Sequence, residues 1–313
     1  MFHFDVKVDS NGFIEFDGVY NWSLTGEPKM TTVDLEGLSI YYEGRGTGEA
    51  IVLAHGIPTD YRAWNAQMDA FQGYRTITYS RRYAAPNNNG GDLNTSTVEN
   101  NAADLSGLIE KLGISPVNLI GHSYGGFVTA YFAAERPEAV RSLVLVEPAI
   151  STLLIEKAES PAQMLSLLLR SPSVATSARK FITGSLNPSL AALDAGQTER
   201  ATELNVDGVQ GRKGAFSSLP DTTRAMMVQN AKTIAELRTK LPPFKDRVGK
   251  IKCRTLTING ETSPLWLRRI GELFATSAKG EHATVRGTAH FPHMENPTEF
   301  NRLVAEFLSK NHG

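Results

Sequence analysis

The stretch VNLIGHSYGG at residues 117–126 restricts the fold of this chain more than any other feature of its sequence. A strand-like segment runs directly into the G-x-S-x-G pattern centred on Ser123, and helix-compatible residues follow through Ala134. A serine on such a sharp turn sits in a strained backbone conformation that leaves no room for side chains two positions away on either side. Gly121 and Gly125 leave that room free. The pattern therefore predicts a turn that presents Ser123 at the N-terminus of a helix, rather than a glycine-rich turn with an incidental serine.

Short apolar runs alternate with helix-period segments from about residue 31 onward. This alternation is typical of an α/β protein with a mostly parallel central sheet flanked by helices. Several runs are nearly continuous in Val, Ile and Leu, as expected of strands that are buried on both faces. The predicted strands cover residues 50–54, 76–79, 117–120, 143–146, 255–259 and 283–285.

Two helices have clear start and stop signals. Ser96 and Glu99 form a capping-box pattern at the start of the first, which ends at Gly113. The second begins at Asn296, has Pro297 in its first turn, and carries one apolar face through residue 308. This last helix is predicted to close the chain against the sheet.

The strand pattern disappears between about residues 149 and 248, where helical stretches follow one another up to Pro242-Pro243. We predict that this segment is a helical lid, inserted after the strand that ends at Glu147, over the edge of the sheet where α/β folds bind ligands. The predicted organisation is an N-terminal extension (1–30), a core in two parts (31–148 and 249–313), and the lid between them. In the lid, four apolar side chains at helical spacing fit ordinary packing better than a substrate cavity: Met164, Leu168, Met226 and Met227.

The N-terminal extension has alternating apolar residues, broken at Asn11-Gly12, that indicate short strands. Val6, Val8, Ile14, Phe16 and Val19 are the apolar positions of this alternation. The extension carries no recognisable chemistry. We interpret it as an added edge or a contact surface, and the oligomeric state stays open, with a homodimer as one option.

Composition excludes several classes of protein. The 32 basic and 33 acidic side chains nearly cancel and form no basic stripe, so nucleic-acid binding has no electrostatic support. The first residues lack the pattern of a signal peptide and no apolar run is long enough to cross a bilayer, so a cytoplasmic protein without membrane contact is expected. The single cysteine, Cys253, reads as a small buried hydrophobe. Metal-ligand motifs and nucleotide-binding loops are missing, so no metal or cofactor is predicted.

Three motifs, in this order and at this spacing, resemble the α/β-hydrolase superfamily, and particularly its lidded serine esterase-like branch. They are HGIP at 55–58, GHSYGG at 121–126 and GTAH at 287–290, and the resemblance extends over roughly residues 31–313. It implies an α/β-hydrolase fold, Ser123 as the nucleophile, and an oxyanion hole formed by the backbone amides of Ile57 and Tyr124. Because related epoxide and haloalkane hydrolases carry Asp where this chain has Ser123, the resemblance argues against their alkyl-enzyme chemistry.

The general base must be a histidine that a loop brings over Ser123. His290 follows the last predicted strand, where the family places its base, and we favour it over His293, which we assign to the loop or the next helix start. His122 is adjacent to Ser123, and neighbours on a tight turn point apart. His55 either supports its turn through the ring or is simply a packed histidine.

The acid that orients the base departs from the family pattern. The family usually has an aspartate after the penultimate strand, and Ser263 occupies that place here. Some branches place the acid at the end of the strand that follows the nucleophile's helix, which makes Glu147 the favoured candidate. Glu261 and a Ser–His dyad without an acid are the alternatives.

We therefore expect a hydrolase of carboxylic esters, including lactones, acting on a small-molecule substrate with an apolar part of small to medium size. Hydrolysis of a carbon–carbon bond in a diketone is a close second. A cofactor-free lyase or oxygenase and a ligand receptor with vestigial hydrolysis are further alternatives. Arg82 fits an ion-paired loop residue better than a ligand for a substrate carboxylate.

Overall fold

The computed structural model describes residues 31–87, 89–157 and 160–310, together with the backbone of three short N-terminal strands. These strands, β1 (Lys7–Val8), β2 (Ile14–Phe16) and β3 (Tyr20–Trp22), pair antiparallel in sequence order. The strand pieces expected in the extension are therefore present at 7–8 and 14–16. The predicted break at residues 11–12 lies outside the described residues.

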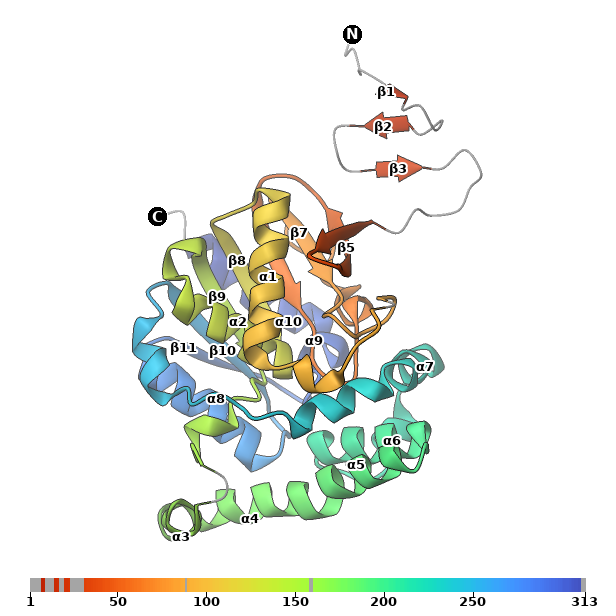
Figure 1. Ribbon diagram of the computed structural model, residues 1–313. Coiled ribbons are helices and arrows are strands. Elements are labelled where there is room, and N and C mark those ends of the chain that lie inside the picture. The colour runs from red at the N-terminus through yellow and green to blue at the C-terminus, as the bar shows by residue number, and fades with distance from the viewer. Residues whose placement is uncertain are drawn as a thin grey trace.

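An eight-stranded sheet forms the core, in the order β11-β10-β9-β8-β6-β7-β5-β4 (Figure 1). Neighbours from β11 to β7 pair parallel, and β5 pairs antiparallel with β7 and β4. All six predicted runs fall within strands of this sheet, so the mostly parallel α/β architecture is confirmed. The strands are β4 (Thr32–Leu35), β5 (Leu38–Arg45), β6 (Glu49–Ala54), β7 (Tyr74–Tyr79), β8 (Val117–His122), β9 (Val140–Val146), β10 (Arg254–Gly260) and β11 (Glu281–Val285).

Helices cover both faces of the sheet. One face packs against α1 (Val98–Leu112), α2 (Ser123–Glu135) and α8 (Leu265–Ala278). The other packs against α10 (Pro297–Ser309), the last helix, as predicted. Successive strand residues alternate between these two layers, and for this reason the central strands are apolar on both sides.

Three helix ends test the capping predictions. The side chain of Thr97, not Ser96, accepts the cap hydrogen bond of α1, from the amide of Asn100, so the predicted capping box is wrong by one residue. The other end of α1 is as predicted, because Gly113 adopts the left-handed conformation (φ 62°) that a side chain disfavours. Asn296 caps α10 through the amide of Glu299, also as predicted.

The segment between β9 and β10, which we call the insertion (residues 149–248), holds helices and, among its described residues, no strand. Figure 1 shows α4 to α7 grouped beyond the end of the sheet at which β9 leaves it. The helices are α3 (Pro161–Arg170), α4 (Pro172–Phe181), α5 (Asn187–Asp194), α6 (Thr198–Gln210) and α7 (Asp221–Gln229).

The apolar side chains of the insertion divide into two groups. Met226 and Met227 are buried, as expected for packing residues. Met164 and Leu168 on α3 are instead 41 % and 49 % exposed, so the expectation that they pack inside is wrong. The physical reason is that α3 buries only one side chain fully, Leu167, and turns the rest of its apolar residues outward.

Candidate active site

Ser123 stands at the junction of β8 and α2, at the carboxyl edge of the sheet. Its φ of 52° is the strained left-handed conformation expected for a serine on this turn. A Cβ on Gly121 would collide with the hydroxyl of Thr129, and one on Gly125 would collide with the carbonyl oxygen of Ala54. These two glycines therefore allow the tight packing that fixes the turn.

Ser123, His290 and Glu147 lie together, although they come from distant parts of the sequence. The Nε2 atom of His290 is 3.0 Å from Ser123 Oγ, and its Nδ1 atom is 3.4 Å from Glu147 Oε2. Nδ1 faces a carboxylate, which only accepts hydrogen bonds, so Nδ1 carries the ring proton and Nε2 is free to accept the proton of Ser123. His290 and Glu147 are almost completely buried.

The carboxylate of Glu147 is held by three donors on its other oxygen. Oε1 accepts hydrogen bonds from Asn259 Nδ2 (2.9 Å), the Gly260 amide (2.7 Å) and Ser263 Oγ (2.8 Å). Glu147 also has a positive φ of 48°, at the point where its strand ends. The serine that occupies the family's aspartate position thus donates to the glutamate that faces the imidazole, a contact that the sequence analysis missed.

The alternative acid, Glu261, lies elsewhere. Its side chain is exposed and accepts a hydrogen bond from the amide of Gly287 at 2.9 Å. The structure does not bring it to His290.

The end of β6 forms the other wall of the site. The backbone of Gly56 approaches so closely that a Cβ on it would lie 2.9 Å from the Cβ of Ser123. Ile57 follows on this turn, and Tyr124 lies in the first turn of α2, where backbone amides have no partner within the helix. The two residues expected to form an oxyanion hole therefore flank Ser123 on adjacent elements.

His55 supports this turn through both ring nitrogens. Its Nδ1 donates to the carbonyl of Gly56 at 2.8 Å, and its Nε2 accepts from the amide of Arg81 at 2.9 Å. Burial, together with the charge of Arg81, holds the pKa of His55 well below its usual value. These two hydrogen bonds require a neutral ring, because one nitrogen donates and the other accepts. His55 therefore stabilises the turn after β6.

His122 and His293 are fully buried beside His290. His122 Nε2 donates to the carbonyl of His290 at 2.8 Å, and the ring of His293 packs 4.3 Å from that of Trp64. Burial, with a smaller effect of His290, lowers the pKa of His293 to about 3. His293 belongs to the short helix α9 (Pro292–Glu295), and neither ring is hydrogen-bonded to Ser123.

The two arginines after β7 both form buried ion pairs. Arg82 binds the carboxylate of Asp104 with two nitrogens, at 2.7 and 2.8 Å, and is therefore committed to the core, as its loop context favoured. Arg81 pairs with Glu236 of the insertion at 2.6 Å, and its guanidinium lies 4.8 Å from the ring centre of Tyr124. This buried link between the insertion and the Ser123 turn carries no local sequence signal.

Two negative observations concern the described residues alone. Within 31–87, 89–157 and 160–310, no group of three or more His, Cys, Asp or Glu side chains is placed to hold a metal ion. No helix in the described part of the chain has the length and apolar character needed to cross a membrane.

Known proteins resemble this chain in sequence over most of its length. A Synechocystis protein named provisionally as a non-heme chloroperoxidase is 27 % identical, over 90 % of this chain and 98 % of its own. A 2-hydroxy-6-oxononadienedioate/2-hydroxy-6-oxononatrienedioate hydrolase of Burkholderia vietnamiensis is 25 % identical, over 93 % of this chain and 98 % of its own.

Solved structures share the fold. The thermophilic esterase from Thermogutta terrifontis superimposes with a TM-score of 0.63 at 23 % identity, over 91 % of this chain and 98 % of that one. The model of the α/β-hydrolase fold family matches residues 49–297, a range that holds Ser123, Glu147 and His290. With this match over most of its length, the chain belongs to the α/β-hydrolase fold family.

Proposed function

We propose that this protein is a serine hydrolase that cleaves carboxylic esters, including lactones, through an acyl-enzyme. The observation that carries the proposal is the hydrogen-bonded series from Ser123 through His290 to Glu147, with separations of 3.0 and 3.4 Å. A serine hydroxyl within hydrogen-bond distance of an imidazole ring, itself oriented by a carboxylate, is the arrangement of an activated nucleophile.

In the first step, Ser123 Oγ attacks the ester carbonyl while His290 Nε2 takes its proton. The backbone amides of Ile57 and Tyr124 stabilise the oxyanion, and Glu147 stabilises the imidazolium that forms. His290 then protonates the leaving alcohol. Water repeats the same sequence on the acyl-enzyme and releases the acid.

We further propose that the insertion acts as a lid and supplies an apolar wall to the site. Met226 and Met227 of α7 share a buried cluster with Phe291, the residue that follows His290. The Arg81–Glu236 ion pair fixes the same segment to the Ser123 turn. This environment favours substrates with a small or medium-sized apolar group.

A test uses p-nitrophenyl esters of increasing acyl length and a fluorophosphonate probe. We expect steady turnover and stoichiometric labelling, both abolished in Ser123→Ala. Labelling at Ser123 without turnover of any ester would contradict the proposed esterase and favour a receptor or a lyase. The Thr129→Ser variant, which keeps the hydroxyl beside Gly121, is the matched control for the turn and should retain activity.

Hydrolysis of a carbon–carbon bond is the second candidate. The similarity to the Burkholderia hydrolase, whose name gives a 2-hydroxy-6-oxo dienedioate as substrate, favours it. There, water would be added across a carbon–carbon bond to give an acid and a smaller fragment. Turnover of such a hydroxy-oxo diene acid at a higher kcat/KM than any ester would replace our first proposal with this one.

A further inference from the structure

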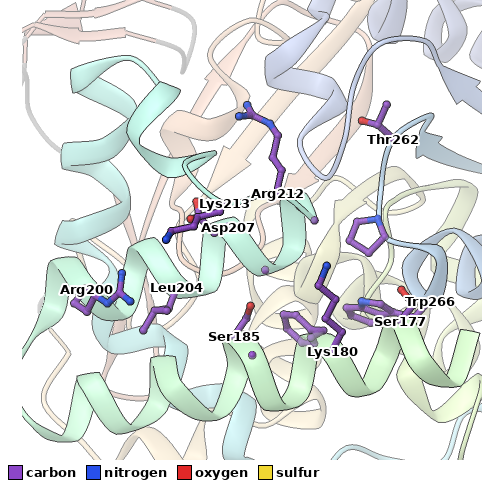
Figure 2. A pocket seen from close by; sticks show the side chains of 15 residues that line it. Ser177, Lys180, Ser185, Arg200, Leu204, Asp207, Arg212, Lys213, Thr262 and Trp266 are labelled. Carbon is purple, nitrogen blue, oxygen red and sulfur yellow. The ribbon is translucent and has the colours of Figure 1, made fainter.

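A pocket of about 480 Å³ lies between the insertion and the start of α8. Figure 2 shows its walls: the helix that carries Lys180 and Ser185, α6 with Leu204, and the loop and helix start at Thr262 and Trp266. Neither Ser123 nor any other residue of the proposed active site lines it. It is therefore a separate cavity.

Positive charge dominates the lining. Four cationic side chains surround the pocket, from α4, α6 and the turn after α6: Lys180, Arg200, Arg212 and Lys213. Arg200 pairs with Glu203, whereas within the described residues no carboxylate forms an ion pair with the other three. Like charges gathered around a cleft concentrate their field in it and attract anions.

One acidic residue, Asp207, also lines the pocket, but its carboxylate forms no ion pair with any of the four cations. Its two carboxylate oxygens accept hydrogen bonds from the backbone amides of Gly214 and Phe216, at 2.7 and 2.9 Å. These bonds fix the turn that carries Arg212 and Lys213. Asp207 thus fixes the shape of the pocket wall and forms no ion pair with the cations of the lining.

An aromatic pair forms a flat apolar wall. The rings of Phe181 and Trp266 stack with centroids 4.9 Å apart and an interplanar angle of 28°. Trp266 is only 7 % exposed, whereas Phe181 is partly exposed, so ring surface rather than a polar atom forms this wall.

The floor of the pocket is closely packed. A Cβ on Gly208 of α6 would collide with the side chain of Ser185, so the two helices approach closely at this point. Ser185 belongs to a π-helical segment, Ile182–Leu186, which joins α4 to α5. Such widened turns often accompany functional sites.

We propose that this pocket binds an organic anion in which a planar apolar group carries an oxyanion, either a carboxylate or a phosphoryl group. The planar group lies against the Phe181–Trp266 pair. The oxyanion is held by the cations of the rim, Lys180 and Arg212 among them. Because the pocket excludes Ser123, the proposal does not depend on the hydrolase activity.

The test is calorimetric titration of the full chain with naphthoate, naphthylphosphonate, neutral naphthalenemethanol and inorganic phosphate. We expect at least one aromatic anion to bind well, and the neutral alcohol and free phosphate to bind at least about tenfold more weakly. The two aromatic anions distinguish a carboxylate from a phosphoryl ligand. Equal affinity for the neutral alcohol, or no binding of either aromatic anion, would overturn the proposal.

Variants locate the ligand. Lys180→Gln with Arg212→Gln should weaken binding about tenfold or more, because two charge-assisted contacts are lost. The charge-matched control is Lys232→Gln with Arg136→Gln, at exposed positions outside the pocket, and should change affinity less than about twofold. Trp266→Leu removes one ring of the stacked Phe181–Trp266 pair, against which the planar group lies, and should weaken binding severalfold.

Binding must also be independent of the nucleophile. Ser123→Ala and fluorophosphonate-labelled protein should bind the anion with unchanged affinity. Loss of binding after labelling would place the ligand at Ser123 and refute the separate site. Thermal unfolding without ligand checks that the variants remain folded. If the Lys180→Gln/Arg212→Gln variant does not fold, the single exposed change Lys180→Gln is compared with the wild type for affinity instead.

Discussion

The hydrogen bond from Ser263 to Glu147 makes a prediction whose size follows from the structure. Ser263 is buried, and its hydroxyl is one of three donors to Glu147 Oε1, at 2.8 Å. A hydrogen bond to a charged group contributes about 1.5–3 kcal/mol, so Ser263→Ala should lower the free energy of unfolding by about 2 kcal/mol. The oxygen that faces His290 keeps its place, held through the two remaining donors, so kcat should fall by less than about tenfold.

Ser263→Asp restores the residue that the family usually has here, but in this protein it should do more harm than alanine. It places a second carboxylate within hydrogen-bond range of Glu147 in a buried site, and an uncompensated buried charge costs about 3–5 kcal/mol. One of the two carboxyls must take up a proton, which is easier at low pH. The loss of stability should therefore be larger at pH 8 than at pH 5.

Urea unfolding at both pH values, with p-nitrophenyl ester kinetics, measures these effects. Thr262→Ala, at the exposed neighbouring position, is the control and should change stability less than about 1 kcal/mol. Two results would refute the reasoning. One is a Ser263→Asp protein as stable as the wild type at pH 8, and the other is a Ser263→Ala protein as inactive as Ser123→Ala.

Three further changes follow from the packing. Gly125→Ala forces a Cβ onto the carbonyl of Ala54, so soluble yield and ester turnover should both collapse, whereas Gly113→Asn, at a helix end, should be tolerated. Glu236→Gln leaves the buried Arg81 without its charge partner, so the free energy of unfolding measured in urea should fall by about 3–5 kcal/mol. A fall of less than about 1 kcal/mol would contradict a buried ion pair. Acid should destabilise the protein, because the three buried histidines with lowered pKa values, His55, His122 and His293, stay neutral when folded and take up protons when unfolded. Between pH 6.5 and pH 5.5 each of them should lower the free energy of unfolding by about 1 kcal/mol. A free energy of unfolding that stays constant over this range would be inconsistent with neutral burial.

The features that the sequence predicted correctly are those with strong local causes. The turn at Ser123 requires glycines at fixed positions, and the central strands require apolar residues on both faces. Both requirements are visible in the sequence, as glycines at fixed spacing and as continuous apolar runs. The ends of α1 and α10 at Gly113 and Asn296 are similarly local.

The features that were missed depend on residues far apart in the chain. The Arg81–Glu236 pair joins positions 155 residues apart, and neither residue has a pattern around it that reveals the other. The bond between Ser263 and Glu147 exists because β9 and β10 are neighbours in the sheet. The edge strand β4 and its neighbour β5 were not predicted, because most of their residues are only partly buried and their apolar pattern is weak.

The choice between Thr97 and Ser96 as the cap of α1 shows a different limit. Both residues can cap a helix, and Ser96 has the glutamate three residues later that a capping box needs. In the structure Ser96 is fully buried and accepts a hydrogen bond from Asn101 Nδ2, so its side chain does not cap the helix. A one-residue error of this kind follows from contacts that no local pattern records.

The most direct test of the account compares Glu147→Gln with Glu261→Gln by kcat/KM for a p-nitrophenyl ester. Glutamine at 147 can still accept the three hydrogen bonds on one side, but it turns an amide donor toward the ring proton of His290. Loss of the acid in this role lowers activity by roughly 10³- to 10⁴-fold, while Glu261→Gln should stay within about threefold of the wild type. Near-normal activity of Glu147→Gln, with the large loss in Glu261→Gln instead, would contradict the assignment of Glu147 as the residue that orients His290.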